Sequence, residues 1–323
     1  MRRSIIIFGN GLGMSLDSNY FPISAGLASV WSGSEYFKAE HKDLIKTAIP
    51  GLTEDTYPST EEQLDDLQVA IVASEYLRGF ETDKVKWLTD QVRELPEAFR
   101  RFIHEVAAYY QGYDAPLPLD FRSSLANYLR STKSHVATLN YDNLLYDGLK
   151  GYEIFEGYNG VLIDGFHRNG FDPDNLNRIR GPRSLGWYLH LHGSPLFVGN
   201  QKLMGGDRAV FTPDEKSHIV LTHVTHKPLV IESSSVLSEY WKRLNEAIQE
   251  VEYIVIFGYS GTDSHLNELL SQKCTNKQLY IIEWSGTGDL DTRCQFWQRI
   301  LRMQELKLIH MTNILCFTAW CKL

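Results

Sequence analysis

Short apolar runs separated by longer amphipathic segments mark out this chain. The runs are rich in β-branched residues, and several end in Gly, Asn, Ser or Thr: SIIIF (4–8), HVATL (135–139), WYLHL (187–191), HIVLT (218–222), YIVIF (253–257), LYIIE (279–283) and LKLIHM (306–311). Continuous apolar strands with helical segments between them indicate a parallel sheet covered on both faces. We therefore predict an α/β fold with a Rossmann-like parallel sheet, and a final strand or interface segment at NILCFTAWCKL (313–323).

The long interval between the first two predicted strands has a helical pattern instead. Thr60-Glu61-Glu62-Gln63 matches a capping box, and Leu64, Leu67 and Ile71 follow at helical spacing. A second amphipathic pattern covers residues 83–111 and is interrupted by Pro96. These patterns predict an inserted helical module.

The predicted division of the chain follows from this interval. Residues 1–27 and 135–323 form the Rossmann-like domain, and residues 28–134 form the inserted α-helical module. The module can act as a lid, as an oligomerisation surface or as plain structural cover, and we expect a mixture of these roles.

Composition sets limits on the partners. The 323 residues are 43% hydrophobic and 22% charged, which is ordinary for a soluble globular protein. The formal net charge of −8 argues against nucleic acid as the chief ligand, because phosphate binding needs clustered Lys and Arg. The length suits one large α/β domain with an appended module, or two domains.

Targeting and cysteine patterns point to a cytoplasmic protein. The apolar run near the N-terminus stops at Gly9, short of a secretory segment, and no run approaches the ~20 apolar residues of a membrane span. The four cysteines are Cys274, Cys294, Cys316 and Cys321, and none forms a C-x-x-C pair. This spacing indicates neither a zinc ribbon nor a disulfide scaffold.

The first predicted strand ends in a glycine-rich bend, Gly9-Asn10-Gly11-Leu12-Gly13. Such a bend lets backbone approach a phosphate closely. The dinucleotide fingerprint G-x-G-x-x-G would place its third glycine at Met14, and the phosphate-loop lysine is missing. The bend therefore predicts a nucleotide-binding loop. A tight turn that serves only packing is an equally good interpretation.

Three further segments follow predicted strands. ATLNYDNLL (137–145) carries Asn140 and Asp142, LHLHGS (189–194) carries His192, and the last is FGYSGTDSHLNELL (257–270). Ligands of open parallel sheets bind beyond the carboxyl ends of the strands. We therefore expect these segments and the glycine bend to converge on one crevice.

The four segments, in this order, resemble the sirtuin-like NAD-consuming domains, and most of all the bacterial NAD⁺ hydrolases of anti-phage defence. The resemblance implies a loop for the NAD phosphates and ribose, with Gly9, Asn10, Gly11, Ser15 and Asp17 as binding residues. It implies a catalytic group of His192 with Asn140 and Asp142 at the nicotinamide ribose and carboxamide. It places Gly258, Ser260, Asp263 and Glu283 at the adenosine half.

The chain departs from the protein-deacetylating sirtuins. The four-cysteine zinc ribbon is missing, and the loop reads G-N-G where the deacetylases have G-A-G. We therefore expect cleavage of NAD⁺ by water into nicotinamide and ADP-ribose, with NAD⁺ as substrate and no metal. The nicotinamide group carries a positive charge while it is bound in NAD⁺, which makes it a good leaving group. An amide such as Asn140 can orient the attacking water, and a neutral imidazole can take a proton from that water.

Each of these residues also has a structural alternative. Asn140 can satisfy local backbone groups, and His192 can be a buried, hydrogen-bonded histidine. Asp142 can cap the helix that starts near Leu144, and Asp263 can cap the helix after it. The histidines His218, His223 and His226 fit no standard ligand spacing, so we predict no metal site there.

The resemblance also implies regulation. An active NAD⁺ hydrolase would harm its host, so we expect a homo-oligomer gated through the helical module. A HerA-type ATPase or an Argonaute encoded alongside is the implied partner. The alternative is a non-catalytic NAD or ADP-ribose sensor that regulates a partner such as an ATPase.

Overall fold

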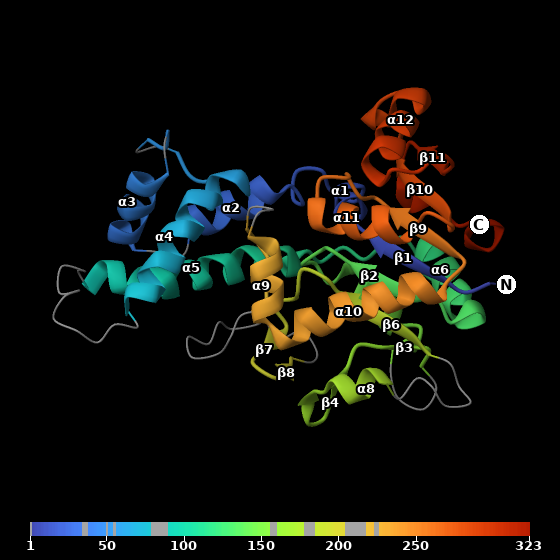
Figure 1. Cartoon of the computed structure of the whole chain (residues 1–323), viewed down its shortest axis with the longest axis horizontal. Coiled ribbons are helices and arrows are strands. Elements are labelled where there is room, and N and C mark those ends of the chain that lie inside the picture. The colour runs from blue at the N-terminus through green and yellow to red at the C-terminus, as the bar shows by residue number, and fades with distance from the viewer. Residues whose placement is uncertain are drawn as a thin grey trace.

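A seven-stranded, wholly parallel sheet forms the centre of the molecule (Figure 1). The computed structural model describes residues 2–33, 38–49, 51–53, 56–78, 90–155, 160–177, 185–203, 218–222 and 226–323. In sheet order the strands are β11 (Lys307–Met311), β10 (Gln278–Trp284), β9 (Tyr253–Phe257), β1 (Ser4–Phe8), β2 (His135–Thr138), β6 (Gly186–His190) and β3 (Leu162–Ile163). The predicted Rossmann-like fold is confirmed.

The central strand β1 explains why the apolar runs are continuous. Ile6 and Phe8 belong to the core on one face of the sheet, and Ile5 and Ile7 belong to the core on the other. All four side chains are fully buried. A strand covered on both faces has no solvent side, so it carries no polar alternation.

Helices from different parts of the chain cover the two faces. The face with Ile6 is covered by α6 (Leu119–Thr132), α7 (Leu144–Lys150) and the 3-10 turns η6 (Ile314–Cys316) and η7 (Trp320–Lys322). The face with Ile5 is covered by α10 (Ser235–Glu250), α11 (Ser264–Lys273) and α12 (Leu290–Leu301), with α8 (Pro173–Asn177) and α9 (Lys227–Ser233) adding to this layer.

Short elements complete the sheet domain. Two antiparallel pairs lie outside the main sheet, β4 (Phe166–His167) with β5 (Gly170–Phe171) and β7 (Phe197–Val198) with β8 (Gln201–Lys202). The glycine bend after β1 contains the one-turn helix α1 (Gly11–Met14), and the 3-10 turn η5 (Ser285–Thr287) follows β10.

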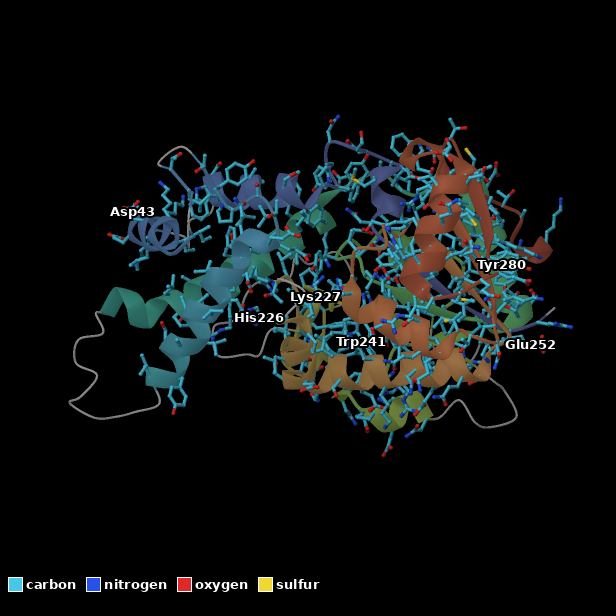
Figure 2. All side chains as sticks on the ribbon, turned by 45° about the horizontal axis from the view of Figure 1, so that its top comes forward. Asp43, His226, Lys227, Trp241, Glu252 and Tyr280 are labelled. Carbon is cyan, nitrogen blue, oxygen red and sulfur yellow. The ribbon has the colours of Figure 1, made fainter. Side chains whose placement is uncertain are left out.

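The helical module extends from one side of the sheet (Figure 1). It contains α2 (Ile23–Gly33), α3 (Ala39–Ala48), η1 (Glu62–Leu64), α4 (Asp65–Arg78), α5 (Asp90–Tyr109) and η3 (Tyr110–Gly112). Its start differs from the predicted 28, because α2 begins at Ile23. Its end differs from 134, because α6 packs on the sheet. Figure 2 shows His226 and Lys227, at the start of α9, where the sheet domain meets this module.

The turn before α4 follows the predicted capping box in part, because the Gln63 side chain reaches back to Ser59 and not to Thr60. Gln63 N–H donates to Thr60 Oγ1 at 3.4 Å, and Gln63 Oε1 accepts from Ser59 N–H at 2.7 Å. The predicted core positions Leu64, Leu67 and Ile71 are buried. The predicted interruption at Pro96 is wrong, since α5 continues through it and is held by buried neighbours such as Phe99 and Phe102.

Two predicted strands are also wrong. Residues 218–222 are buried, but the segment makes only one isolated bridge, between Ile219 and Gly193, so burial did not bring strand pairing. The C-terminal segment forms η6 and η7. Its residues Ile314, Leu315, Phe317 and Trp320 are buried against the sheet without pairing as a strand, and the alternative of an interface segment stays a prediction.

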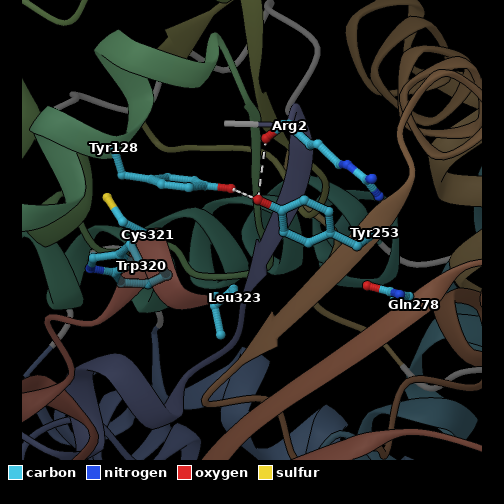
Figure 3. A pocket seen from close by; sticks show the side chains of 7 residues that line it. All are labelled: Arg2, Tyr128, Tyr253, Gln278, Trp320, Cys321 and Leu323. Carbon is cyan, nitrogen blue, oxygen red and sulfur yellow. Dashed lines mark hydrogen bonds between the residues drawn. The ribbon is translucent and has the colours of Figure 1, made fainter.

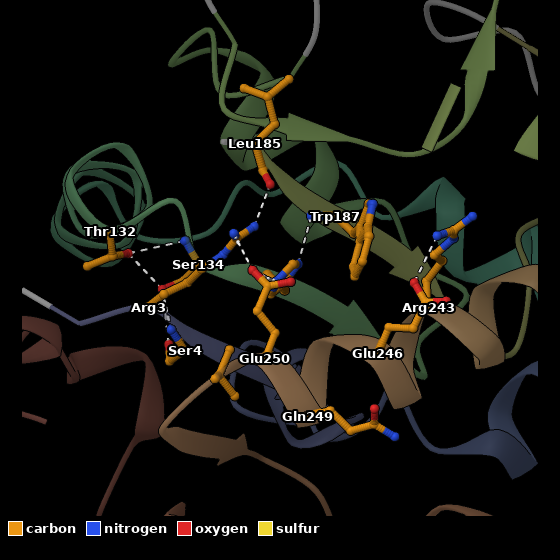
Figure 4. A network of polar contacts seen from close by, with 12 residues as sticks. Arg3, Ser4, Thr132, Ser134, Leu185, Trp187, Arg243, Glu246, Gln249 and Glu250 are labelled. Carbon is orange, nitrogen blue, oxygen red and sulfur yellow. Dashed lines mark hydrogen bonds and ion pairs between the residues drawn. The ribbon is translucent and has the colours of Figure 1, made fainter. Parts of the chain in front are cut away.

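Polar contacts cluster at the amino edge of the sheet, away from the strand ends that were predicted to bind ligand. The Tyr128 and Tyr253 hydroxyls bond each other beside a cavity of about 280 Å³, and Tyr253 Oη also reaches the Arg2 carbonyl at 3.2 Å (Figure 3). Nearby, Arg3 pairs with Glu250 and with the Leu185 carbonyl (Figure 4). These contacts tie the first residues of β1 to α10 and to the segment before β6.

We expect Trp320→Ala to destabilise the fold by about 3–5 kcal/mol, the usual range for truncating a large buried aromatic side chain. The Trp320 ring packs against Phe257 at 5.5 Å and Phe121 at 5.8 Å between ring centroids. Trp284→Ala is the matched control, because Trp284 is 55% exposed. Urea unfolding of the two variants and of the unmodified protein measures the change in the free energy of unfolding. Equal losses in the two variants would contradict the packing role.

Candidate active site

Loops that follow β1, β2, β6 and β9 meet around one cavity of about 400 Å³. Residues from all four predicted segments line it: Gly9, Asn10, Asn140, Asp142, His192, Ser260 and Asp263. The structure therefore brings the four segments together at the carboxyl edge of the sheet, as the sequence predicts. The volume is within the range of small-molecule sites, roughly 300–1,000 Å³.

The glycine bend serves packing between two of these loops. Gly11 N–H donates to the Gly258 carbonyl at 2.7 Å. A Cβ atom at Gly11 would lie 2.5 Å from that oxygen, and one at Gly9 would lie 2.7 Å from the Tyr259 Cα. Gly11 and Gly258 are not among the cavity-lining residues. These glycines allow the loops after β1 and β9 to pack directly against each other. Of these glycines, Gly9 also lines the cavity.

Two other predicted loop residues also lie outside the cavity lining. Asp17 Oδ1 accepts from the N–H groups of Asn19 and Tyr20, at 2.9 and 3.1 Å, and so closes a turn. The Ser15 carbonyl accepts from Asn313 Nδ2 at 3.1 Å. The predicted phosphate contacts of Asp17 and Ser15 therefore stay predictions, and both residues have structural partners.

Glu283 is held by structural partners and is not among the residues that line the cavity, so its predicted ribose contact stays a prediction. Its carboxylate accepts from Arg293 Nε and Nη2 at 2.9 and 2.7 Å, Trp297 Nε1 at 3.0 Å, His310 Nε2 at 2.9 Å and Thr287 Oγ1 at 3.2 Å. Burial acts to raise the pKa of Glu283, but these donors lower it below its usual value. The four nitrogen donors match the roughly four lone-pair positions of a carboxylate. Glu283 therefore joins α12 and β11 to the end of β10.

Asn140 lines the cavity, and its side-chain oxygen is buried without a partner among the described residues. Its Nδ2 donates to the Gly9 carbonyl at 3.2 Å, so the structural alternative accounts for half of the amide. Its Oδ1 is buried and has no hydrogen-bond partner among the residues that the structure describes. A buried acceptor without a donor costs about 1–3 kcal/mol, so this oxygen calls for a ligand donor.

Asp142 is a second buried polar group in the cavity wall. Its Oδ1 accepts from Leu144 N–H at 3.0 Å, a turn contact made from the residue before the N-cap Asn143, so Asp142 supports the start of α7 without being its cap residue. Burial raises the pKa of Asp142 to about 7. Near neutral pH this carboxyl can therefore either hold or release a proton beside the cavity.

His192 is oriented by Asp263. The distance from His192 Nε2 to Asp263 Oδ2 is 2.9 Å, and Asp263 Oδ1 accepts from Leu266 N–H at 3.0 Å, which caps α11. Burial acts to raise the pKa of Asp263, but the His192 bond and the charges of His192 and Lys227 hold it well below its usual value. An ionised carboxylate only accepts, so Nε2 carries the hydrogen and Nδ1 is the proton acceptor of the neutral ring.

Sequence reasoning missed three charged residues of this wall, Lys227, Glu61 and Glu62. Lys227 Nζ lies 3.1 Å from Asp263 Oδ2 and 3.1 Å from Glu61 Oε2. Glu61 belongs to the predicted capping box, which indicated a helix start and nothing about the cavity. Lys227 had no signal in the sequence, because its partners are far from it along the chain.

Clusters of metal-ligating side chains can be assessed for the described residues. Within them, no group of three or more His, Cys, Asp or Glu side chains could hold a metal ion. His218 bonds Ser234 Oγ and the Gly199 carbonyl at 2.7 Å each, and His226 pairs with Asp65 at 2.7 Å. His223 lies outside the described residues.

Among the described helices, none is long and apolar enough to cross a membrane.

Comparisons with known proteins give a family for this chain. A family model described as SIR2-like domain matches residues 134–298, about half of the chain, and this range includes Asn140, His192 and Asp263. A search of curated proteins gives no match. A similar solved structure, titled "Structural Basis for the Mechanism and Regulation of Sir2 Enzymes", is 11% identical with a TM-score of 0.39, over 98% of this chain and 89% of that one.

We expect Asp142→Asn to change how stability depends on pH. The native pKa of about 7 lies above the value of about 3.9 for an unfolded Asp, so between these pH values the unfolded chain loses this proton while the native protein keeps it. This carboxyl therefore lowers stability as pH rises from 4 to 7, by roughly 1.4 kcal/mol per unit of difference in pKa. The variant keeps the acceptor for Leu144 N–H and loses the titration.

Urea unfolding from pH 4 to 8 measures this effect. The stability of Asp142→Asn relative to the unmodified protein should grow with pH up to about 7 and then level off. Asp172→Asn is the matched control, because Asp172 makes the same kind of turn contact with Asp174 N–H at an exposed position. A difference that stays constant over this range would show that Asp142 is not buried in the way described.

Proposed function

The chain belongs to the SIR2-like family, and on that basis we propose that it hydrolyses NAD⁺ at the nicotinamide–ribose bond, releasing nicotinamide and ADP-ribose. One observation carries the proposal. His192, oriented by Asp263, and Asn140, with its unpaired Oδ1, line the same cavity although they come from separate strand ends. The pairing of an oriented base with a free amide oxygen suits delivery of a water molecule.

Cleavage of the nicotinamide–ribose bond requires little acid catalysis by the protein. Nicotinamide leaves as a neutral molecule from a cationic glycosidic centre, so the bond breaks through an oxocarbenium-like state that water then captures. The site has to fix the sugar, orient the nucleophile and accept one proton. Asn140 Oδ1 can accept a hydrogen bond from water or from a ribose hydroxyl, and His192 Nδ1 can accept the proton.

Asp263 completes this arrangement. Its negative charge stabilises the imidazolium that forms when His192 takes a proton, and its hydrogen bond keeps Nδ1 free. Asp142 adds a carboxyl whose protonation changes near neutral pH.

The lining of the cavity fits a dinucleotide substrate. Phe21 and Tyr110 give it an aromatic wall against which a heterocyclic ring can pack. Gly9, Asn10 and Ser260 add backbone and polar groups from the loops after β1 and β9. A non-catalytic sensor of NAD or ADP-ribose would use the same lining, but it has no need of the His192–Asp263 pair.

A wider role follows from the resemblance stated above. We propose that the protein acts in the cytoplasm as an effector of anti-phage defence that depletes NAD⁺. In this proposal it works as a homo-oligomer and is gated by a HerA-type ATPase or an Argonaute. The helical module offers a route for such gating, because its residues Thr60 and Glu61 reach the cavity wall.

We expect His192→Ala to abolish nicotinamide release, with kcat at least about 100-fold lower, because loss of a general base removes about 10²–10⁴ of the rate. Chromatography of nicotinamide after incubation with NAD⁺ measures this, and circular dichroism checks the fold. His167→Ala is the control, since His167 is exposed and far from the cavity lining. Undiminished turnover in His192→Ala would overturn the assignment. Binding of NAD⁺ without any release by the unmodified protein would favour the sensor.

Asn140→Ala tests the second catalytic residue. If Oδ1 orients the nucleophile, kcat falls by about 100-fold or more with little change in KM. Steady-state kinetics over a range of NAD⁺ concentrations separates the two constants. A rise in KM at constant kcat would make Asn140 a binding residue only.

A further inference from the structure

Lys227 connects the helical module to the His192–Asp263 pair. Its side chain is only 5% exposed, and its ammonium group bonds Asp263 Oδ2 and Glu61 Oε2 at 3.1 Å each. Burial acts to lower the pKa of Lys227, but the charges of Asp263 and Glu61 raise it above its usual value. The ammonium group is therefore a permanent positive charge beside the cavity.

This charge lies close to the imidazole of His192. Both nitrogens bond the same oxygen, Asp263 Oδ2, at 2.9 Å for His192 Nε2 and 3.1 Å for Lys227 Nζ, so they are no more than about 6 Å apart. A positive charge at this distance disfavours protonation of the ring, and the shared carboxylate favours it. Lys227 and Asp263 therefore act on the His192 ring with charges of opposite sign.

Glu61 enters this balance from the helical module. It precedes η1, and its carboxylate compensates part of the Lys227 charge. A second ion pair joins the same two parts, between Asp65 Oδ1 on α4 and His226 Nε2 beside Lys227, at 2.7 Å. Lys227 therefore has one carboxylate partner from the sheet domain and one from the helical module.

We propose that Lys227 is a positioning residue through which the helical module sets the proton affinity of His192, and so the pH range in which the base works. When Glu61 holds Lys227, less of its positive charge acts on His192. Loss of the Glu61 contact would leave the ammonium charge uncompensated and would lower the proton affinity of the ring. This inference rests on the proposed function, because it assigns regulation to the same base.

The other titratable groups that face His192 are also identified. Tyr141 has its ring centroid 6.4 Å from that of His192, and its hydroxyl donates to the Val220 carbonyl. Burial raises the pKa of Tyr141 well above its usual value and lowers that of His265, the histidine on α11. Asp142 titrates in the same cavity. It is unchanged in the variants below, so it does not produce differences between them.

Two substitutions in the full chain give shifts of opposite sign. Lys227→Met removes the positive charge, so the pKa of His192 should rise by about one unit or more. Glu61→Gln removes the compensating negative charge, so that pKa should fall by a smaller amount. NMR titration of ¹³Cε1-labelled histidines measures both, with the His192 signal assigned from its loss in His192→Ala. This readout does not depend on catalysis.

Two controls separate charge from loosened docking. Lys242→Met removes a lysine from α10 that is 59% exposed, and it should leave the His192 titration unchanged. Asp65→Asn weakens the same docking surface without touching Lys227, and its shift should be smaller than that of Glu61→Gln. The acid limb of the kcat/KM profile should move with the NMR midpoint in each active variant.

The outcomes are distinct. Opposite shifts in Lys227→Met and Glu61→Gln support the inference, whereas no shift, or shifts in the same direction, would overturn it. If the unmodified protein releases no nicotinamide while the titrations still shift in opposite directions, the proposed function fails and the electrostatic coupling stands. If the protein is active and the titrations do not shift, only the inference fails.

Discussion

The carboxylate of Asp263 is the contact on which the arrangement of the site depends. One of its oxygens accepts from Leu266 N–H and starts α11, and the other accepts from His192 and Lys227. It therefore joins the loop after β6, the start of α9 and the helix after β9 in one buried ionic group. Loss of one partner from a buried ion pair leaves an unpaired charge, which costs about 3–5 kcal/mol. The Asp263 contacts that orient the His192 imidazole therefore also hold the strand-end loops together.

The two edges of the sheet use buried polar groups differently. At the amino edge, Arg3 pairs with Glu250, and the Ser4 hydroxyl lies 2.8 Å from the Tyr128 hydroxyl, so charges and hydroxyls meet partners within the fold. At the carboxyl edge, Asn140 Oδ1 has no partner among the described residues, and burial raises the pKa of Asp142. Unpaired buried acceptors and perturbed carboxyls gather where a protein binds or transforms a ligand. Buried side-chain atoms without a partner among the described residues also occur at the amino edge, such as Arg3 Nε and Trp320 Nε1. Asn140 Oδ1 and Asp142 differ from these because they belong to residues that line the cavity at the edge where parallel sheets place their sites.

The sequence predicts the sheet and the meeting of the four loops because both follow from local patterns. Strands buried on two faces must be apolar throughout, as Ile5 and Ile6 show from opposite sides of β1. The failures come from contacts that leave no local pattern. A buried acid at a strand end has the same sequence environment whether it faces a ribose or, as Glu283 does, an arginine and a tryptophan. The Lys227 contacts join segments far apart along the chain, so only the folded structure reveals them.

The central claim is that the loops after β1, β2, β6 and β9 form one dinucleotide site with an imidazole and an amide beside the scissile bond. A crystal structure of the full chain with a non-hydrolysable carbocyclic analogue of NAD⁺ tests it most directly. The account predicts the nicotinamide-bearing ring between Asn140 and His192, with a ligand group or ordered water donating to Asn140 Oδ1. An analogue bound elsewhere, for example in the cavity beside Tyr253 at the amino edge, would contradict it.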